Sequence, residues 1–114
     1  MSNKSKGTDF ENDFVALLGQ QGYWAHRIAE AQDGSQPFDV IAMKAGVSYV
    51  WDCKTCDAKI FSIKRLEENQ ISSFERWLAC GGTMPMVAIK TKKGHIVFVE
   101  YAELKEKGKI YLRE

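Results

Sequence analysis

Two apolar runs joined by a short turn decide the fold: residues 37–54 read PFDVIAMKAGVSYVWDCK. Both runs are rich in β-branched and aromatic residues, which favour strands. The linking tripeptide Lys44-Ala45-Gly46 is short enough for a hairpin. We therefore predict two antiparallel strands, over residues 38–43 and 47–54.

Acidic residues interrupt both of these runs. Asp39 is the second residue of the first run, and Asp52 lies near the end of the second. Asp52 and Lys54 are two residues apart, so both project from the same face of a strand. If the hairpin folds back over equal lengths, Asp39 lies beside Asp52. The sequence thus predicts two carboxylates and one ammonium group in a single patch.

Such a patch favours a particular chemistry. Two adjacent carboxylates repel each other unless a cation lies between them, and oxygen ligands select hard ions such as Mg²⁺ or Mn²⁺. A neighbouring lysine can direct its charge at a phosphate oxygen or at an attacking water. These are the requirements of phosphodiester hydrolysis.

The flanking segments predict helices and further strands. The expected order is a helix over 9–21, a short strand over 23–28, a loop over 31–37, the hairpin, a helix from Leu66 to Leu78, strands over 86–92 and 96–99, and a tail with a helical turn and a last strand over 110–112. This order predicts one α/β domain over residues 8–114, with a mixed sheet flanked by helices. A flexible polar arm is expected over residues 1–7.

Composition narrows the class of protein. The 114 residues are 45% hydrophobic, enough for one core but not for two domains. Three cysteines, an odd number, and the lack of an apolar segment near the N-terminus predict a soluble cytoplasmic protein. With 16 basic and 15 acidic residues, the formal charge is +1. We therefore expect weak, salt-sensitive affinity for plain duplex DNA.

Two further polar residues lie where apolar ones are expected. Glu11 is in line with Val15 and Leu18 on the inward side of the first helix, and Gln70 lies on the core side of the second. Glu11 can instead close a capping box with Thr8, and a glutamine in a first helical turn is ordinary. Each of these two residues can therefore belong either to the functional site or only to the end of its helix.

The spacing of these residues resembles a known superfamily. Pro37-Phe38-Asp39 followed by Asp52-Cys53-Lys54 resembles the PD-(D/E)xK nuclease signature, with one residue inserted after Pro and Asp as the second acid. Within it, the chain most resembles Holliday-junction resolvases of the RecU and archaeal Hjc type. The residues that carry this likeness are Lys6-Gly7, Phe10-Glu11, Arg27, Gly34-Ser35, Asp39, Asp52-x-Lys54-Thr55 and Gln70. RecU enzymes are longer, so a compact Hjc-like or phage-encoded form is expected.

The resemblance implies a restriction-endonuclease-like fold with an αβββαβ core, and a role for each matched residue. Glu11, Asp39, Asp52 and the backbone carbonyl of Cys53 are implied to hold Mg²⁺, for which Mn²⁺ can substitute. Lys54 is implied to act on the nucleophilic water or the developing charge, and Gln70 to orient water or phosphate. Such enzymes are homodimers that cut branched DNA.

Several side chains are candidates for contacts with DNA. Lys6, Arg27 and Ser35, which carry part of the resemblance, are candidates for phosphate contacts, although Arg27 and Ser35 can each be a simple loop or strand-edge residue. The residues themselves suggest a basic edge at the second hairpin, formed by Lys90, Lys92 and Lys93. A solvated hairpin tip explains these lysines equally well.

Other functions remain as alternatives. The same residues could serve a general nuclease of the VRR-NUC type acting on flaps or ends, or a DNA-binding module without activity. Cys53-Lys54-Thr55-Cys56 is a C-x-x-C motif of the kind found in zinc and redox sites. Residues three apart in a strand face opposite sides, however, so we expect these sulfurs not to converge.

Overall fold

The computed structural model describes residues 3–113, with side chains from residue 7 onward, and its centre is a five-stranded mixed sheet. The strand order is β1-β2-β3-β5-β6. The strands are β1 (Trp24–Arg27), β2 (Val40–Lys44), β3 (Val47–Cys56), β5 (Met86–Thr91) and β6 (Ile96–Glu100). This arrangement confirms the predicted α/β class.

The predicted hairpin is present. Strands β2 and β3 pair antiparallel with Val40 opposite Trp51, and β1 extends the sheet antiparallel beside β2. Strand β3 then pairs parallel with β5. A parallel pair needs a crossover connection, and helix α2 (Glu68–Ala79) lies within it.

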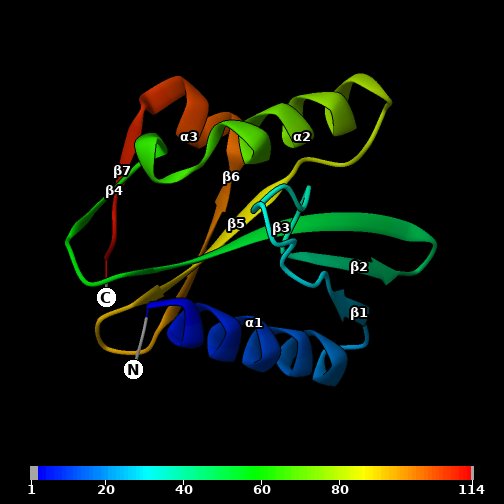
Figure 1. Cartoon of the computed structure of the whole chain (residues 1–114), viewed down its shortest axis with the longest axis horizontal. Helices are drawn as coiled ribbons and strands as arrows, with labels where there is room; N and C mark the ends of the chain where they lie inside the picture. Colours follow the sequence, from blue (N-terminus) through cyan, green and yellow to red (C-terminus); the bar gives the residue numbers. More distant parts are fainter. Residues whose placement is uncertain (1–2, 114) are drawn as a thin grey trace.

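Helices cover both faces of the sheet (Figure 1). Helix α1 (Asn3–Gln20) packs Phe10, Phe14 and Leu18 against one face, where they meet Trp51 of β3. The other face is covered by α2 and by α3 (Tyr101–Lys107), which bury side chains such as Phe74 and Tyr101. Strand side chains alternate between two cores, because successive residues of a strand face opposite sides.

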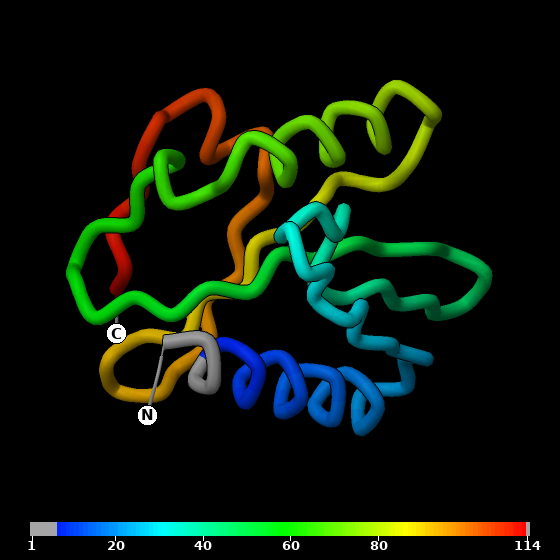
Figure 2. The backbone as a smooth tube through the Cα atoms, viewed as in Figure 1, coloured from blue at the N-terminus to red at the C-terminus, as the bar shows by residue number. Residues whose placement is uncertain are grey.

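A small second sheet joins distant parts of the chain. Strand β4 (Ile60–Ser62) pairs antiparallel with β7 (Lys109–Tyr111), so the green and red segments lie side by side (Figure 2). The 3₁₀ helix η1 (Ile63–Arg65) follows β4 and leads to α2. The last strand was expected, whereas β4 and η1 were not predicted.

Two predicted boundaries are wrong. The first helix begins at Asn3 rather than at residue 9, so Thr8 lies inside it, and residues 3–7, assigned to the arm, are helical. A cap is worth only about 1 kcal/mol, too little to fix where a packed helix starts. Strand β2 begins at Val40 rather than residue 38, which places Asp39 just before the strand.

The turn after α2 requires glycine at residue 82. A Cβ atom there would collide with the indole ring of Trp77, which donates a hydrogen bond of 2.8 Å from Nε1 to the carbonyl of Thr83. We expect Gly82→Ala to lower the free energy of unfolding by about 1–3 kcal/mol. Gly19→Ala is the matched control: a Cβ at helical Gly19 meets nothing within 4 Å, so this change should stabilise by about 0.5–1 kcal/mol. Urea unfolding measures both, and equal effects would contradict the packing argument.

None of the described helices is long and apolar enough to cross a membrane.

Candidate active site

The hairpin brings Asp39 and Asp52 together as predicted. The backbone N–H of Asp39 donates to the carbonyl of Trp51 at 3.1 Å, which continues the β2–β3 register by one residue and sets the two acids opposite each other. Both are buried, with 6% and 1% of their surface exposed. Asp39 Oδ2 accepts a hydrogen bond of 2.8 Å from the backbone N–H of Cys53.

Asp52 is held by two residues but is only partly satisfied. Gln70 Nε2 donates to Oδ1 at 2.5 Å, and Lys54 Nζ lies 3.3 Å from Oδ2. Oδ2 is nonetheless buried without a hydrogen-bond partner. Burial raises the pKa of Asp52 well above its ordinary value, Asp39 raises it further, and the ammonium of Lys54 opposes both. This buried oxygen therefore interacts with the ammonium of Lys54 through charge alone and keeps the capacity to coordinate a cation.

Gln70 connects the acids to helix α2. Its Oε1 accepts hydrogen bonds from Lys54 Nζ at 3.2 Å and from the backbone N–H of Glu67 at 2.9 Å. The second bond belongs to a capping box, in which the Glu67 side chain in turn accepts from the backbone of Gln70. Because Oε1 faces two donors and Nε2 faces a carboxylate, the orientation of the amide is fixed. The second helix therefore starts at the site.

Glu11 faces the same space from α1, but it pairs with Arg27. Arg27 Nη1 lies 3.6 Å from Glu11 Oε1. The pKa of Glu11 is raised to about 7, mainly by burial and then by Asp39, while Arg27 lowers it. Among residues 7–113, no three His, Cys, Asp or Glu side chains are grouped as a metal-binding cluster. The structure therefore brings Asp39 and Asp52 together, and Glu11 lines the same cavity as Asp39 while paired with Arg27.

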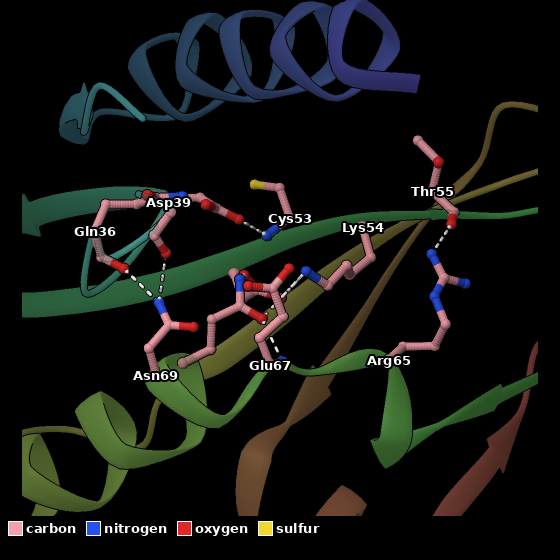
Figure 3. A network of polar contacts seen from close by, with 11 residues as sticks. Gln36, Asp39, Cys53, Lys54, Thr55, Arg65, Glu67 and Asn69 are labelled. Carbon is pink, nitrogen blue, oxygen red and sulfur yellow. Dashed lines mark hydrogen bonds and ion pairs between the residues drawn. The ribbon is translucent and has the colours of Figure 1, made fainter. Parts of the chain in front are cut away.

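These residues surround a cavity of about 560 Å³. Its lining includes Glu11, Arg27, Asp39, Lys54, Arg65 and Gln70. On one side, Asn69 Nδ2 donates to the carbonyls of Gly34 and Gln36, at 2.9 and 3.2 Å, and so ties the β1–β2 loop to α2 (Figure 3). The cavity is a polar site lined by the buried carboxylate of Asp39 and the partly buried carboxylate of Glu11.

Comparison with known proteins agrees with this geometry. The family model described as archaeal Holliday junction resolvase (Hjc) matches residues 2–113. The chain belongs to the Hjc family. It is 31% identical over 107 residues to the crossover junction endodeoxyribonuclease Hjc of Methanocaldococcus jannaschii, covering 94% of this chain and 74% of that protein. The predicted resemblance to Hjc-type resolvases is confirmed.

The fold agrees with a solved Hjc structure. The Holliday junction resolvase Hjc of Archaeoglobus fulgidus superposes with a TM-score of 0.66 at 22% identity, covering 83% of this chain and 72% of the other. This similarity confirms the mixed sheet flanked by helices. The phage origin considered for this member of the Hjc family stays a prediction.

Some predicted DNA contacts lie away from the cavity. Ser35 is exposed, and its Oγ donates to Asp33 Oδ1 at 2.5 Å rather than lining the cavity. Lys90 and Lys92 line a second cavity, of about 320 Å³, which shares Thr55 with the first. Lys93 is exposed in the hairpin turn, and the side chain of Lys6 lies outside the described residues. Of the predicted DNA contacts that are described, only Arg27 lines the acidic site.

Three residues of the site were missed from sequence. Two of them, Arg65 and Glu67, line the cavity. The third, Asn69, donates a hydrogen bond to the β1–β2 loop at its edge. They precede or begin α2, immediately before Gln70, and this proximity is the one signal that could have found them. Their partners are largely backbone atoms, which leave no pattern in a sequence.

The C-x-x-C motif does not form a site. Cys53 packs in the core under α1, and Cys56 packs in the core on the other face of the sheet. Both are free thiols. Burial and then the nearby carboxylates of Asp39, Asp52 and Glu11 raise the pKa of Cys53 well above its ordinary value. Cys53 therefore keeps its proton at neutral pH.

Without metal, the acids of the site should make stability depend on pH. The pKa of Glu11 is about 7 in the folded protein against an ordinary 4.5, so the folded state holds this proton more tightly. Its contribution to stability is full below pH 4.5 and is lost as the pH rises through 7. In EDTA, the melting temperature of the wild type should fall by a few degrees relative to that of Glu11→Gln as the pH rises from 4.5 to 7. Parallel melting curves for the two proteins would contradict the raised pKa.

Proposed function

We propose that the chain resolves four-way DNA junctions by metal-dependent hydrolysis of phosphodiester bonds. The observation that carries the proposal is one cavity lined by Asp39, Lys54 and Gln70, with Asp52 buried behind Lys54 and Gln70 and in contact with both, in a member of the Hjc family. The relative from M. jannaschii is named a crossover junction endodeoxyribonuclease. The same class of reaction suits the acids and lysine of this chain.

The side chains suit a hard divalent cation. Asp39 and Asp52 offer adjacent carboxylates, and Asp52 Oδ2 is a buried oxygen that no hydrogen bond satisfies. Glu11 and the backbone carbonyl of Cys53 complete the proposed donor set. Oxygen donors of this kind select Mg²⁺ or Mn²⁺. When bound there, the ion supplies Lewis-acid charge for phosphodiester hydrolysis.

The residues around the acids position charge. Lys54 is held by Asp52 and Gln70, so its ammonium group stays in the cavity where a phosphate oxygen gains negative charge. Gln70 fixes Asp52 and Lys54 relative to each other through one amide. Arg27 keeps Glu11 beside the site and presents a guanidinium group to the cavity. These contacts orient the groups before DNA arrives, which lowers the free energy of activation of the reaction.

The proposal also includes the side chains that contact DNA and the oligomeric state of the protein. We propose that Lys90, Lys92 and Lys93 contact the backbone of an adjoining arm; phosphate contacts by Lys6 and Ser35 stay predictions from the sequence. Two symmetric cuts require two sites, so the working form is a homodimer. Light scattering tests the assembly, and a monomer in the presence of junction DNA would contradict it.

A cleavage assay tests the function directly. Synthetic four-way junctions, flaps and linear duplexes of matched arm sequence are each incubated with Mg²⁺, with Mn²⁺ or with EDTA. We expect paired symmetric nicks in the junction, little cleavage of linear duplex, and none in EDTA. Preferential cleavage of flaps or ends would favour a general nuclease. Binding to DNA without cleavage in either metal would favour a DNA-binding module.

A further inference from the structure

Arg65 lines the cavity beside β3, in a segment to which no role has been given. It is the last residue of η1, is exposed, and lines the same cavity as Asp39, Lys54 and Gln70. We propose that Arg65 binds a backbone phosphate of the DNA strand that enters this cavity. This inference rests on the proposed function, since it takes DNA to be the ligand.

Arg65 is held in place before any ligand arrives. Its Nη2 donates a hydrogen bond of 2.8 Å to the carbonyl of Thr55, the residue after Lys54 (Figure 3). Its guanidinium carbon lies 5.4 Å from the centre of the fully buried Phe61 ring. A cation over an aromatic face is attracted to it. An exposed arginine fixed by two contacts loses less conformational freedom on binding.

The positive charge of Arg65 differs from the other positive charges at the cavity in having no carboxylate partner among the described residues. Arg27 pairs with Glu11, and Lys54 lies against Asp52, so two of the cations at the cavity already have carboxylate partners. Arg65 forms no ion pair with any carboxylate of the described residues, and its hydrogen bond goes to a neutral carbonyl. Its positive charge is therefore free to meet an anion.

The shape of the guanidinium group of Arg65 also suits a phosphate. A guanidinium carries five N–H donors in a planar fork, which matches the oxygens of a phosphate. One nitrogen of Arg65 is engaged by Thr55, which leaves the remaining donors for a ligand. Because Lys54 and Thr55 are adjacent in β3, a phosphate bound at Arg65 lies next to the one at the acids. Arg65 thus sets the position of the strand along the cavity.

The test measures binding to an immobile four-way junction in EDTA, where no cleavage occurs, over a series of KCl concentrations. We expect Arg65→Gln to weaken binding by about three- to tenfold and to reduce the slope of log K against log salt by about one. Lys64→Gln is the matched control: Lys64 is exposed in the same 3₁₀ helix but does not line the cavity. This control should leave the slope unchanged.

A second measurement is independent of any change in folding. Each phosphate near the crossover is replaced in turn by a neutral methylphosphonate, and the wild type should lose affinity at the position that Arg65 contacts. Arg65→Gln should be insensitive at that same position. Arg65→Lys, which keeps the charge without the fork, should retain the salt slope while binding more weakly.

The outcomes separate this inference from the proposed function. If the wild type binds the junction and Arg65→Gln matches it in affinity, slope and methylphosphonate pattern, Arg65 has no phosphate contact and the proposed function stands. If the wild type binds no junction DNA, both proposals fail.

Discussion

Asp52→Asn is expected to reduce junction cleavage by about a thousandfold while leaving junction binding in EDTA within about twofold of the wild type. The change removes a negative oxygen donor from the most buried acid of the site, which is 1% exposed. It also places an amide where Lys54 Nζ now lies 3.3 Å from Oδ2. Single-turnover cleavage with Mg²⁺ measures the first effect, and anisotropy measures the second.

The control for this variant is Asp13→Asn, on the exposed side of α1, which removes the same charge from a residue that does not line the cavity. Its cleavage should equal that of the wild type. A melting temperature of Asp52→Asn close to that of the wild type excludes unfolding as the cause. Undiminished cleavage by this variant would falsify the assignment of the active site.

Lys54→Met is expected to lower the rate of cleavage by about 10²- to 10³-fold at saturating Mg²⁺. Methionine keeps most of the packed stem, because the lysine side chain is only 16% exposed, but it removes the ammonium group from the site. It also leaves Asp52 without the positive charge that opposes its raised pKa. We therefore expect the pH at which cleavage is half-maximal to move upward as well.

The matched control for Lys54 is Lys59→Met, in the exposed turn after β3. It should cleave as the wild type does. If Lys54→Met lost only affinity for DNA, with an unchanged rate at saturation, Lys54 would be a binding residue rather than one that stabilises charge during the reaction. Rate measurements at several enzyme concentrations distinguish the two.

The central pair of acids could be predicted from sequence because the turn is short. Two residues, Ala45 and Gly46, separate the paired Lys44 and Val47, so counting back from the turn places Asp39 opposite Asp52. The three-residue turn expected from the sequence places Asp39 one residue away, opposite Trp51, which is close enough to predict that the two acids are neighbours. The helical spacing around Gln70 likewise placed its side chain toward the core. The closeness of the two acids and the direction of Gln70 could both be predicted from local geometry.

Contacts across long stretches of sequence could not be predicted. Strand β4 has three residues and pairs with β7 near the other end of the chain, so no local pattern identifies it. Asn69 binds the β1–β2 loop through two backbone carbonyls, and any residue could supply those carbonyls. The position of Glu11 depends on its pairing with Arg27 across two elements, which helix periodicity alone does not describe.

Gln70 belongs both to the cap of α2 and to the active site, so local unfolding of the helix start disrupts the site. The same Oε1 that caps α2 also holds Lys54, so fraying of the first helical turn releases the ammonium group and Asp52 together. The population of molecules with an intact site is then set by the opening equilibrium of one turn. The backbone N–H of Gln70 donates a hydrogen bond of 3.0 Å to the Glu67 carbonyl, and the rate of its hydrogen exchange reports this opening equilibrium.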